Sequence, residues 1–140
     1  MDDAMEGAGA AAHSERFDRG WQRLGEIDGE AGEKVIKSLS DIAPDLGRYI
    51  VEFGFGDIYS RPGLDLKSRE IATVAALTAM GNAAPQLKVH INAALNVGVS
   101  KGEIVEIIIQ MVAYAGFPAA LNAMALAKEV FAEREVGESA

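Results

Sequence analysis

Residues 100–115, SKGEIVEIIIQMVAYA, decide the fold class, because their composition admits either a strand or a helix. Isoleucine and valine dominate the centre, and β-branched residues of this kind are favoured in buried strands. Ser100 and Glu103, however, form the S-x-x-E pattern of a helical capping box. The apolar side chains then repeat at helical spacing, at Ile104, Ile108, Met111 and Val112. We therefore expect a helix that ends before Gly116.

The rest of the chain beyond residue 13 has helical spacing as well, and no segment has an evident partner strand. The expected helices cover residues 14–27, 32–42, 44–59, 66–80, 85–97, 101–115 and 118–134. Ser14 and Asp65 are expected N-caps, and Pro62-Gly63 marks the clearest loop, at residues 60–65. The fold class is therefore all-α, with about six to seven helices.

Length and composition limit the possible domain organisation and cellular location of the protein. The 140 residues suit one domain, which we place at 14–134 between a disordered tail at 1–13 and a C-terminal tail at 135–140. No apolar run approaches the roughly 20 residues of a membrane span, and acids stand where a signal peptide carries positive charge. We therefore expect a cytoplasmic protein without membrane contact.

Charge and missing residue types exclude several function classes. The net charge is −8 and no basic stripe is visible, which argues against nucleic-acid binding. The absence of cysteine removes thiolate nucleophiles, dithiol redox chemistry and thiolate metal sites. The chain has two histidines, so a zinc site would need several carboxylate ligands beside them, and we expect no bound metal.

Glu70 and His90 are the main candidates for chemistry. Each shares a helix face with packing residues, and the two expected helices follow one another through a short loop, so they should pack antiparallel. A carboxylate that holds an imidazole orients the ring and favours its charged form, which suits acid/base catalysis near neutral pH. The alternative is a hydrogen-bonded core histidine beside a glutamate that merely favours its helix dipole.

Two further stretches carry polar groups that can contact a small anion. Tyr114 and Asn122 flank the helix start at Pro118, where unpaired backbone N–H groups accept carboxylates; the alternative is an ordinary helix corner. Tyr59 and Arg61 lie at the loop of residues 60–65. Arg61 and Arg69 can each bind a carboxylate bidentately, although exposed arginines are common.

Four stretches together resemble the carboxymuconolactone decarboxylase family, whose fold is alkylhydroperoxidase D-like. They are ERFDRGWQRL (15–24), APDLGRYIVEFGFGDIYSRPGLDLKSREIATVAAL (43–77), LKVHINAALNVGVSKGEIVEIIIQ (87–110) and AYAGFPAALNA (113–123). They come in the family's order and spacing. The resemblance implies an all-helical fold that assembles as a ring-like homo-oligomer, expected to be a hexamer, with a trimer as the alternative.

The family has a redox branch and a decarboxylase branch, and the redox branch carries a Cys-x-x-Cys pair ahead of the histidine. Those positions are Ala83 and Gln86 here, so dithiol peroxidase chemistry is excluded. The resemblance then implies decarboxylation of 4-carboxymuconolactone, or a similar γ-lactone polycarboxylate, to the enol-lactone and CO2 in the β-ketoadipate route of aromatic catabolism. This reaction needs no cofactor.

In that reaction His90 would be the proton donor or the oxyanion partner, and Glu70 would set its charge state. The residues implied to hold the small anionic lactone substrate are Arg61, Arg69, Tyr59, Gln86, Tyr114 and Asn122. Two alternatives stay open: a family member that acts on a different small acid, and a non-catalytic helical assembly.

Overall fold

The computed structural model describes residues 13–139, and within this range the chain is helical throughout, without strands. The all-α prediction is confirmed: seven α-helices and one π-helix are present among these residues. The chain divides into two compact units, residues 1–64 and 65–140, which are described separately below. The tail expected at residues 1–13 lies outside the described range except for His13, whose ring stacks on Phe17 with centroids 3.9 Å apart.

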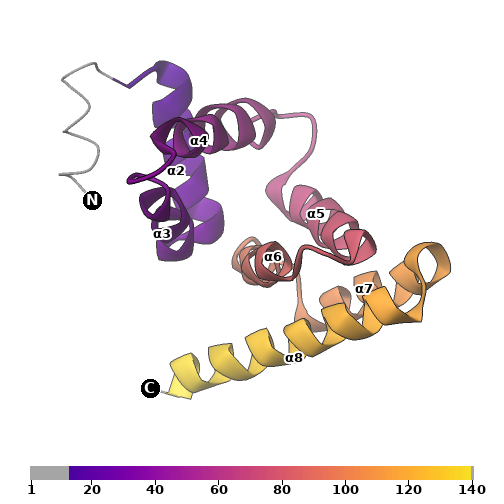
Figure 1. Ribbon diagram of the computed structural model, residues 1–140. Coiled ribbons are helices and arrows are strands. Elements are labelled where there is room, and N and C mark those ends of the chain that lie inside the picture. Colours follow the sequence, from indigo (N-terminus) through magenta and orange to yellow (C-terminus); the bar gives the residue numbers. More distant parts are fainter. Residues whose placement is uncertain (1–12, 140) are drawn as a thin grey trace. The chain divides into compact units, whose positions relative to one another are not determined.

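The first unit contains α2 (Glu15–Asp28), α3 (Glu30–Ser38), α4 (Pro44–Tyr49) and the π-helix η1 (Ile50–Ile58). Ser14 caps α2 as predicted, since its side chain accepts a hydrogen bond from the Phe17 amide at 3.0 Å. The helix α2 packs along η1 (Figure 1). The apolar core of this unit is small and consists of Phe17, Leu24, Ile27, Ile36, Val51 and Phe55.

The helix expected at 44–59 changes its hydrogen bonding halfway, which the sequence did not indicate. From Ile50 the backbone follows i→i+5 bonding, and η1 closes with the Tyr59 amide donating to the Gly54 carbonyl at 2.9 Å. The close crossing of α2 accompanies this change. A Cβ atom on Gly20 would overlap the Val51 carbonyl, and one on Gly56 would overlap the Arg16 carbonyl. Glycine is therefore required on both sides of the crossing.

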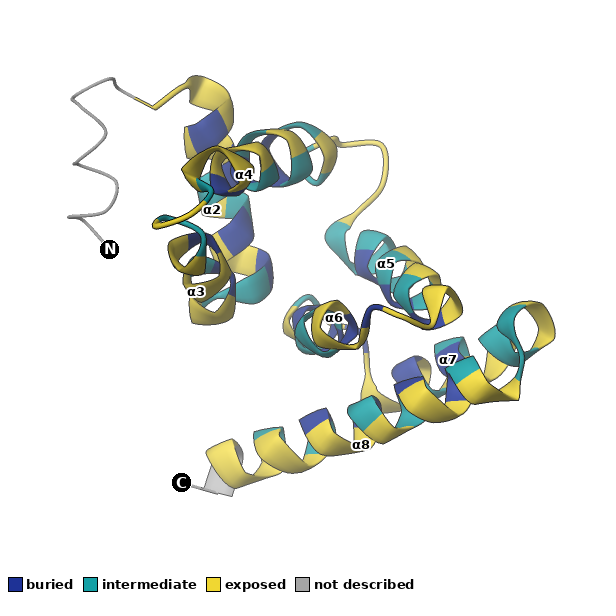
Figure 2. Ribbon diagram, viewed as in Figure 1, coloured by how far each residue is buried: buried dark blue, intermediate teal, exposed yellow. Residues whose placement is uncertain are grey.

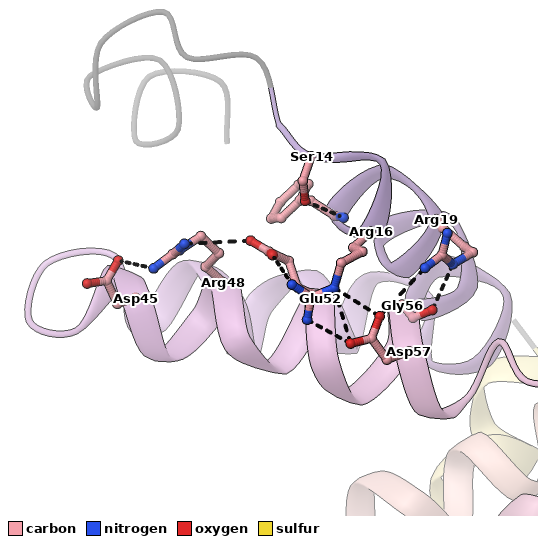
Figure 3. A network of polar contacts seen from close by, with 9 residues as sticks. Ser14, Arg16, Arg19, Asp45, Arg48, Glu52, Gly56 and Asp57 are labelled. Carbon is pink, nitrogen blue, oxygen red and sulfur yellow. Dashed lines mark hydrogen bonds and ion pairs between the residues drawn. The ribbon is translucent and has the colours of Figure 1, made fainter.

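An ionic network runs along the same crossing (Figure 3). Arg16 donates to both carboxylate oxygens of Asp57, at 2.7–3.1 Å, and to Glu52 at 3.3 Å. Arg48 continues the network to Asp45 at 3.1 Å. The hydrogen bond from Arg16 lowers the pKa of Asp57 below its ordinary value. The network ties α2 to η1 through charged groups that remain partly exposed to water.

The second unit contains α5 (Leu66–Met80), α6 (Ala84–Asn96), α7 (Lys101–Ala115) and α8 (Phe117–Ser139). Two of its predicted signals are confirmed. Asp65 caps α5 by accepting from the Ser68 amide at 2.7 Å. Ser100 and Glu103 form the complete capping box of α7, with both bonds at 3.0 Å. The segment that admitted a strand or a helix is therefore helical.

The four helices pack around one apolar core, and α8 shows how. Its buried residues recur along one side, next to α6 and α7 (Figure 2), at Ala120, Ala123, Ala127 and Val130. On α6, Lys88 binds Glu129 and Glu133 of α8 at 2.9 Å each. The helix continues to Ser139, beyond the end expected near Arg134.

No helix among residues 13–139 is long and apolar enough to cross a membrane.

Candidate active site

The helices α5 and α6 follow one another, with only residues 81–83 between them, and pack against each other. Gly81 ends α5 in the left-handed conformation, at φ 73°, where a residue without a Cβ is least strained. The buried face of α5 carries Glu70, Val74 and Thr78, spaced four residues apart. A helix repeats every 3.6 residues, so these three side chains point the same way, toward the core of the second unit.

Glu70 and His90 form the direct pair that the sequence left as one of two possibilities. The Nδ1 atom of His90 lies 2.9 Å from Oε2 of Glu70. The Glu70 side chain is 0% exposed, whereas the His90 side chain is 20% exposed. The carboxylate is therefore held inside the protein, and the imidazole stands between it and solvent.

The bond to Glu70 distinguishes the two ring nitrogens of His90. When Glu70 is ionised it can only accept hydrogen bonds, and Nδ1 of His90 then carries the proton that faces it. The nitrogen that Glu70 does not engage is Nε2. In a neutral ring Nε2 is an acceptor, and in an imidazolium ring it is a donor. A ring held in this way can give a proton to a reacting atom or take one from it.

The second carboxylate oxygen of the pair is unusual. Oε1 of Glu70 is buried and has no hydrogen-bond partner. A buried polar atom without a partner costs stability, and such atoms are rare away from functional sites. The pair is thus not explained by stability alone. It keeps an acceptor available inside the core, next to the oxygen that orients His90.

The other candidates in the second unit lie around its surface. Gln86 is exposed on the first turn of α6, one turn ahead of His90. Arg69 is half-buried, and its carbonyl accepts from the Thr73 hydroxyl at 2.9 Å. Tyr114 is 79% exposed in the last turn of α7. Asn122 lines a cavity that does not include Glu70 or His90.

Tyr59 and Arg61 belong to the first unit. The Tyr59 ring stacks on Phe55 with centroids 5.3 Å apart, at the end of η1. Arg61 is exposed in the loop that follows, where its amide donates to the Ile58 carbonyl at 3.1 Å. Among the eight candidate residues, the structure joins Glu70 to His90 by a direct hydrogen bond. The substrate contacts of the other six stay predictions.

Sequence reasoning missed Thr78. Its side chain is 1% exposed and its hydroxyl Oγ1 has no hydrogen-bond partner. Its spacing of eight residues from Glu70, on the same buried face of α5, was the available signal. As for metals, residues 13–139 hold no group of three or more His, Cys, Asp or Glu side chains arranged to bind an ion.

Comparison with known proteins gives one family. The family model described as "Carboxymuconolactone decarboxylase family" matches residues 44–129. A 4-carboxymuconolactone decarboxylase of Acinetobacter baylyi is 36% identical over 118 residues, covering 84% of this chain and 87% of the relative. An uncharacterised 15.0 kDa protein of Paracoccus denitrificans is 36% identical over 101 residues, covering 71% and 75%. A nitrosuccinic acid decarboxylase of Metarhizium robertsii is 29% identical over 113 residues, covering 80% and 78%.

Proposed function

Because the chain belongs to the carboxymuconolactone decarboxylase family, we propose that it is a cofactor-free decarboxylase of a small carboxylated lactone. The proposed reaction converts 4-carboxymuconolactone, or a similar γ-lactone polycarboxylate, to the enol-lactone and CO2. The observation that carries the proposal is the contact of His90 with the buried carboxylate of Glu70, with 2.9 Å between Oε2 and Nδ1. The named decarboxylases among the relatives support the reaction class.

The proposed reaction requires few functional groups from the protein. The bond between the ring carbon and its carboxylate breaks, CO2 leaves, and the electron pair moves through the ring alkene onto the lactone carbonyl. The resulting dienolate must be stabilised and then protonated on carbon. Both tasks suit one imidazolium: its Nε2–H first donates a hydrogen bond to the developing oxyanion and then provides the proton for carbon.

Glu70 acts in this scheme through His90. Its charge favours the imidazolium form, and its bond to Nδ1 directs Nε2 to the substrate. A positioned acid or base contributes roughly 10²–10⁴-fold in rate. A lost oxyanion donor costs about 10²–10³-fold. His90 is the proposed catalytic residue and Glu70 the proposed positioning residue.

A different small acid as the true substrate is the second candidate, and one relative favours it. Nitrosuccinic acid is not a lactone, but it has the same electronic feature as 4-carboxymuconolactone. In both compounds a carboxylate leaves a carbon whose electron pair is delocalised, into a nitro group in one and into an unsaturated lactone in the other. Both also carry a carboxymethyl arm on that carbon. The same Glu70–His90 pair serves either substrate.

We also propose that the chain works as a homo-oligomer, with a hexamer expected ahead of a trimer. Large apolar side chains at the junction of α7 and α8 support this: Tyr114 is 79%, Phe117 70% and Leu121 66% exposed. Exposed apolar residues that gather in this way are typical of interaction surfaces. Light scattering of the purified protein tests the proposal, and a monomer at micromolar concentration contradicts it.

Purified protein incubated with 4-carboxymuconolactone and, separately, with nitrosuccinic acid tests the function. Ultraviolet absorbance follows substrate loss, a coupled assay follows CO2, and a parallel reaction contains a metal chelator. Turnover of the lactone that the chelator leaves unchanged is the expected result. Turnover of the nitro acid alone moves the assignment to the second candidate, and turnover of neither by a folded protein removes the lactone proposal.

A further inference from the structure

A guanidinium group without an acid partner lies between α6 and α8 in the second unit. Arg134 of α8 is half-buried, and its Nη1 atom donates to the side-chain oxygens of Asn92 at 3.3 Å and Asn96 at 3.2 Å. Both asparagines belong to α6, about one turn apart. Among residues 13–137, whose side chains the structure describes, no carboxylate forms an ion pair with Arg134. Neutral groups therefore hold this positive charge in place.

The donors that Arg134 does not use lie on one edge of its side chain. A guanidinium has five N–H donors, and the bonds to the two asparagines both come from Nη1. The other three donors belong to Nε and Nη2. Neither of these atoms has a hydrogen-bond partner within the described residues, and neither is buried. A ligand from solvent can therefore reach this edge.

Another arginine of the chain shows which ligand suits this edge. Arg16 uses the same two atoms, Nε and Nη2, to bind both carboxylate oxygens of Asp57 at 2.7–3.1 Å (Figure 3). Its Nη1 atom, like that of Arg134, binds elsewhere, in this case to Glu52 at 3.3 Å. Two parallel N–H groups match the two oxygens of a carboxylate. Arg134 therefore presents to solvent the donor pair that Arg16 presents to an aspartate.

The two acids that flank Arg134 in the sequence do not occupy this edge. Glu133 binds Lys88 at 2.9 Å, and Glu135 binds Lys101 at 3.6 Å. Consecutive side chains on a helix diverge by about 100°, so neither glutamate points in the direction of Arg134. Each of these acids has a cation of its own, which leaves the Nε and Nη2 donors of Arg134 for an external anion.

We propose that Arg134 binds the carboxylate of a small organic acid through its Nε and Nη2 donors. The asparagines hold the guanidinium in one orientation, so less side-chain freedom is lost when the acid binds. Asn92 follows His90 by two residues, which is about 200° around the helix axis. The site is therefore separate from the Glu70–His90 pair, and it does not depend on the proposed function.

Nuclear magnetic resonance titration with two matched probes tests the proposal on the full chain. Benzoate is the carboxylate, and benzamide is a neutral compound of nearly the same shape. Sodium chloride keeps the ionic strength constant, so that general screening does not change during the titration. Benzoate should shift the side-chain amide resonances of Asn92 and Asn96 saturably at millimolar concentration, and benzamide should leave them in place. The shifts should survive His90→Ala, which separates this site from the candidate active site.

Three variants complete the test. Arg134→Gln removes the charge and should abolish the saturable shifts. Arg134→Lys keeps the charge but loses the paired donors, and it should bind benzoate about fivefold to tenfold more weakly. Lys128→Gln removes the same charge from an exposed position of α8 and should bind benzoate as the wild type does. The proposal is overturned if benzoate gives no saturable shift, if benzamide binds equally, or if Arg134→Lys binds benzoate as tightly as the wild type.

Discussion

Glu70 and His90 meet across α5 and α6, with Oε2 of the fully buried carboxylate 2.9 Å from Nδ1 of the imidazole. A buried carboxylate with only one of its oxygens bonded costs desolvation energy that a single hydrogen bond does not fully return. Two apolar side chains at these positions would pack into the core without this desolvation cost. The arrangement is therefore best understood as a device for holding His90 in one orientation and one tautomer.

Removing the charge of Glu70 should change how His90 titrates. In Glu70→Gln, the titration midpoint of the His90 ring protons should move to lower pH, because a carboxylate favours the charged imidazole. Turnover should fall by about 10²- to 10³-fold, the lower part of the range for a positioned acid. Proton resonance titration and steady-state kinetics measure both effects. Glu106→Gln, an exposed change on α7, is the control; an unmoved His90 midpoint in Glu70→Gln removes Glu70 as a positioning residue.

Two glycines of α2 should respond to alanine in opposite ways. Gly20→Ala forces a Cβ atom into the Val51 carbonyl, so it should lower the free energy of unfolding by about 3 kcal/mol or more. A Cβ atom on Gly25 meets nothing within 4 Å, and Gly25→Ala should stabilise the helix by about 0.5–1 kcal/mol. Urea denaturation measures both changes. Equal effects at the two positions would contradict the close crossing of α2 and η1.

The capping box of α7 should be measurable by one substitution and its rescue. Ser100→Ala removes the acceptor of the Glu103 amide and should cost about 1 kcal/mol of stability. Ser100→Asp keeps an acceptor at the N-cap and should recover most of that loss. Thermal denaturation compares the three proteins. A loss that aspartate fails to recover would mean that Ser100 acts through something other than its hydrogen bond.

Acid should remove the contribution of the Asp65 cap. The hydrogen bond from the Ser68 backbone amide lowers the pKa of Asp65 below its ordinary value of 3.8. A carboxyl group with a lowered pKa in the folded state stabilises it above the ordinary pKa, and this contribution is lost as the pH falls through the folded value. The melting temperatures of the wild type and Asp65→Ala should therefore differ at pH 6 and converge toward pH 3. A difference that does not change with pH would exclude the charged cap.

The features that the sequence predicted well depend on local chemistry. Ser14, Asp65 and Ser100 each bond an amide within three residues, so their roles follow from short patterns that no distant contact alters. The pairing of Glu70 with His90 could be predicted as a possibility for a related reason. A connection of three residues keeps α5 and α6 in contact, which leaves few arrangements for their polar residues.

The features that escaped prediction depend on packing between helices. The change to π-helical bonding at Ile50 accompanies the close approach of α2 to Gly56, and no residue of the segment marks it alone. The missing partner of the Thr78 hydroxyl appears only when α6 and α8 are in place around it. For the six other candidate residues, the residue types indicated which groups a substrate could contact but not where the fold places them.

The most direct test of the central claim compares the two histidines of the chain. His90→Ala and His13→Ala are assayed beside the wild type for loss of 4-carboxymuconolactone, after circular dichroism has established that all three are folded. His13 is exposed and outside the second unit, so its variant should retain full activity. We expect His90→Ala to lose about 10²–10⁴-fold in kcat. Activity of a folded His90→Ala within about threefold of the wild type would contradict the assignment of His90 as the catalytic residue.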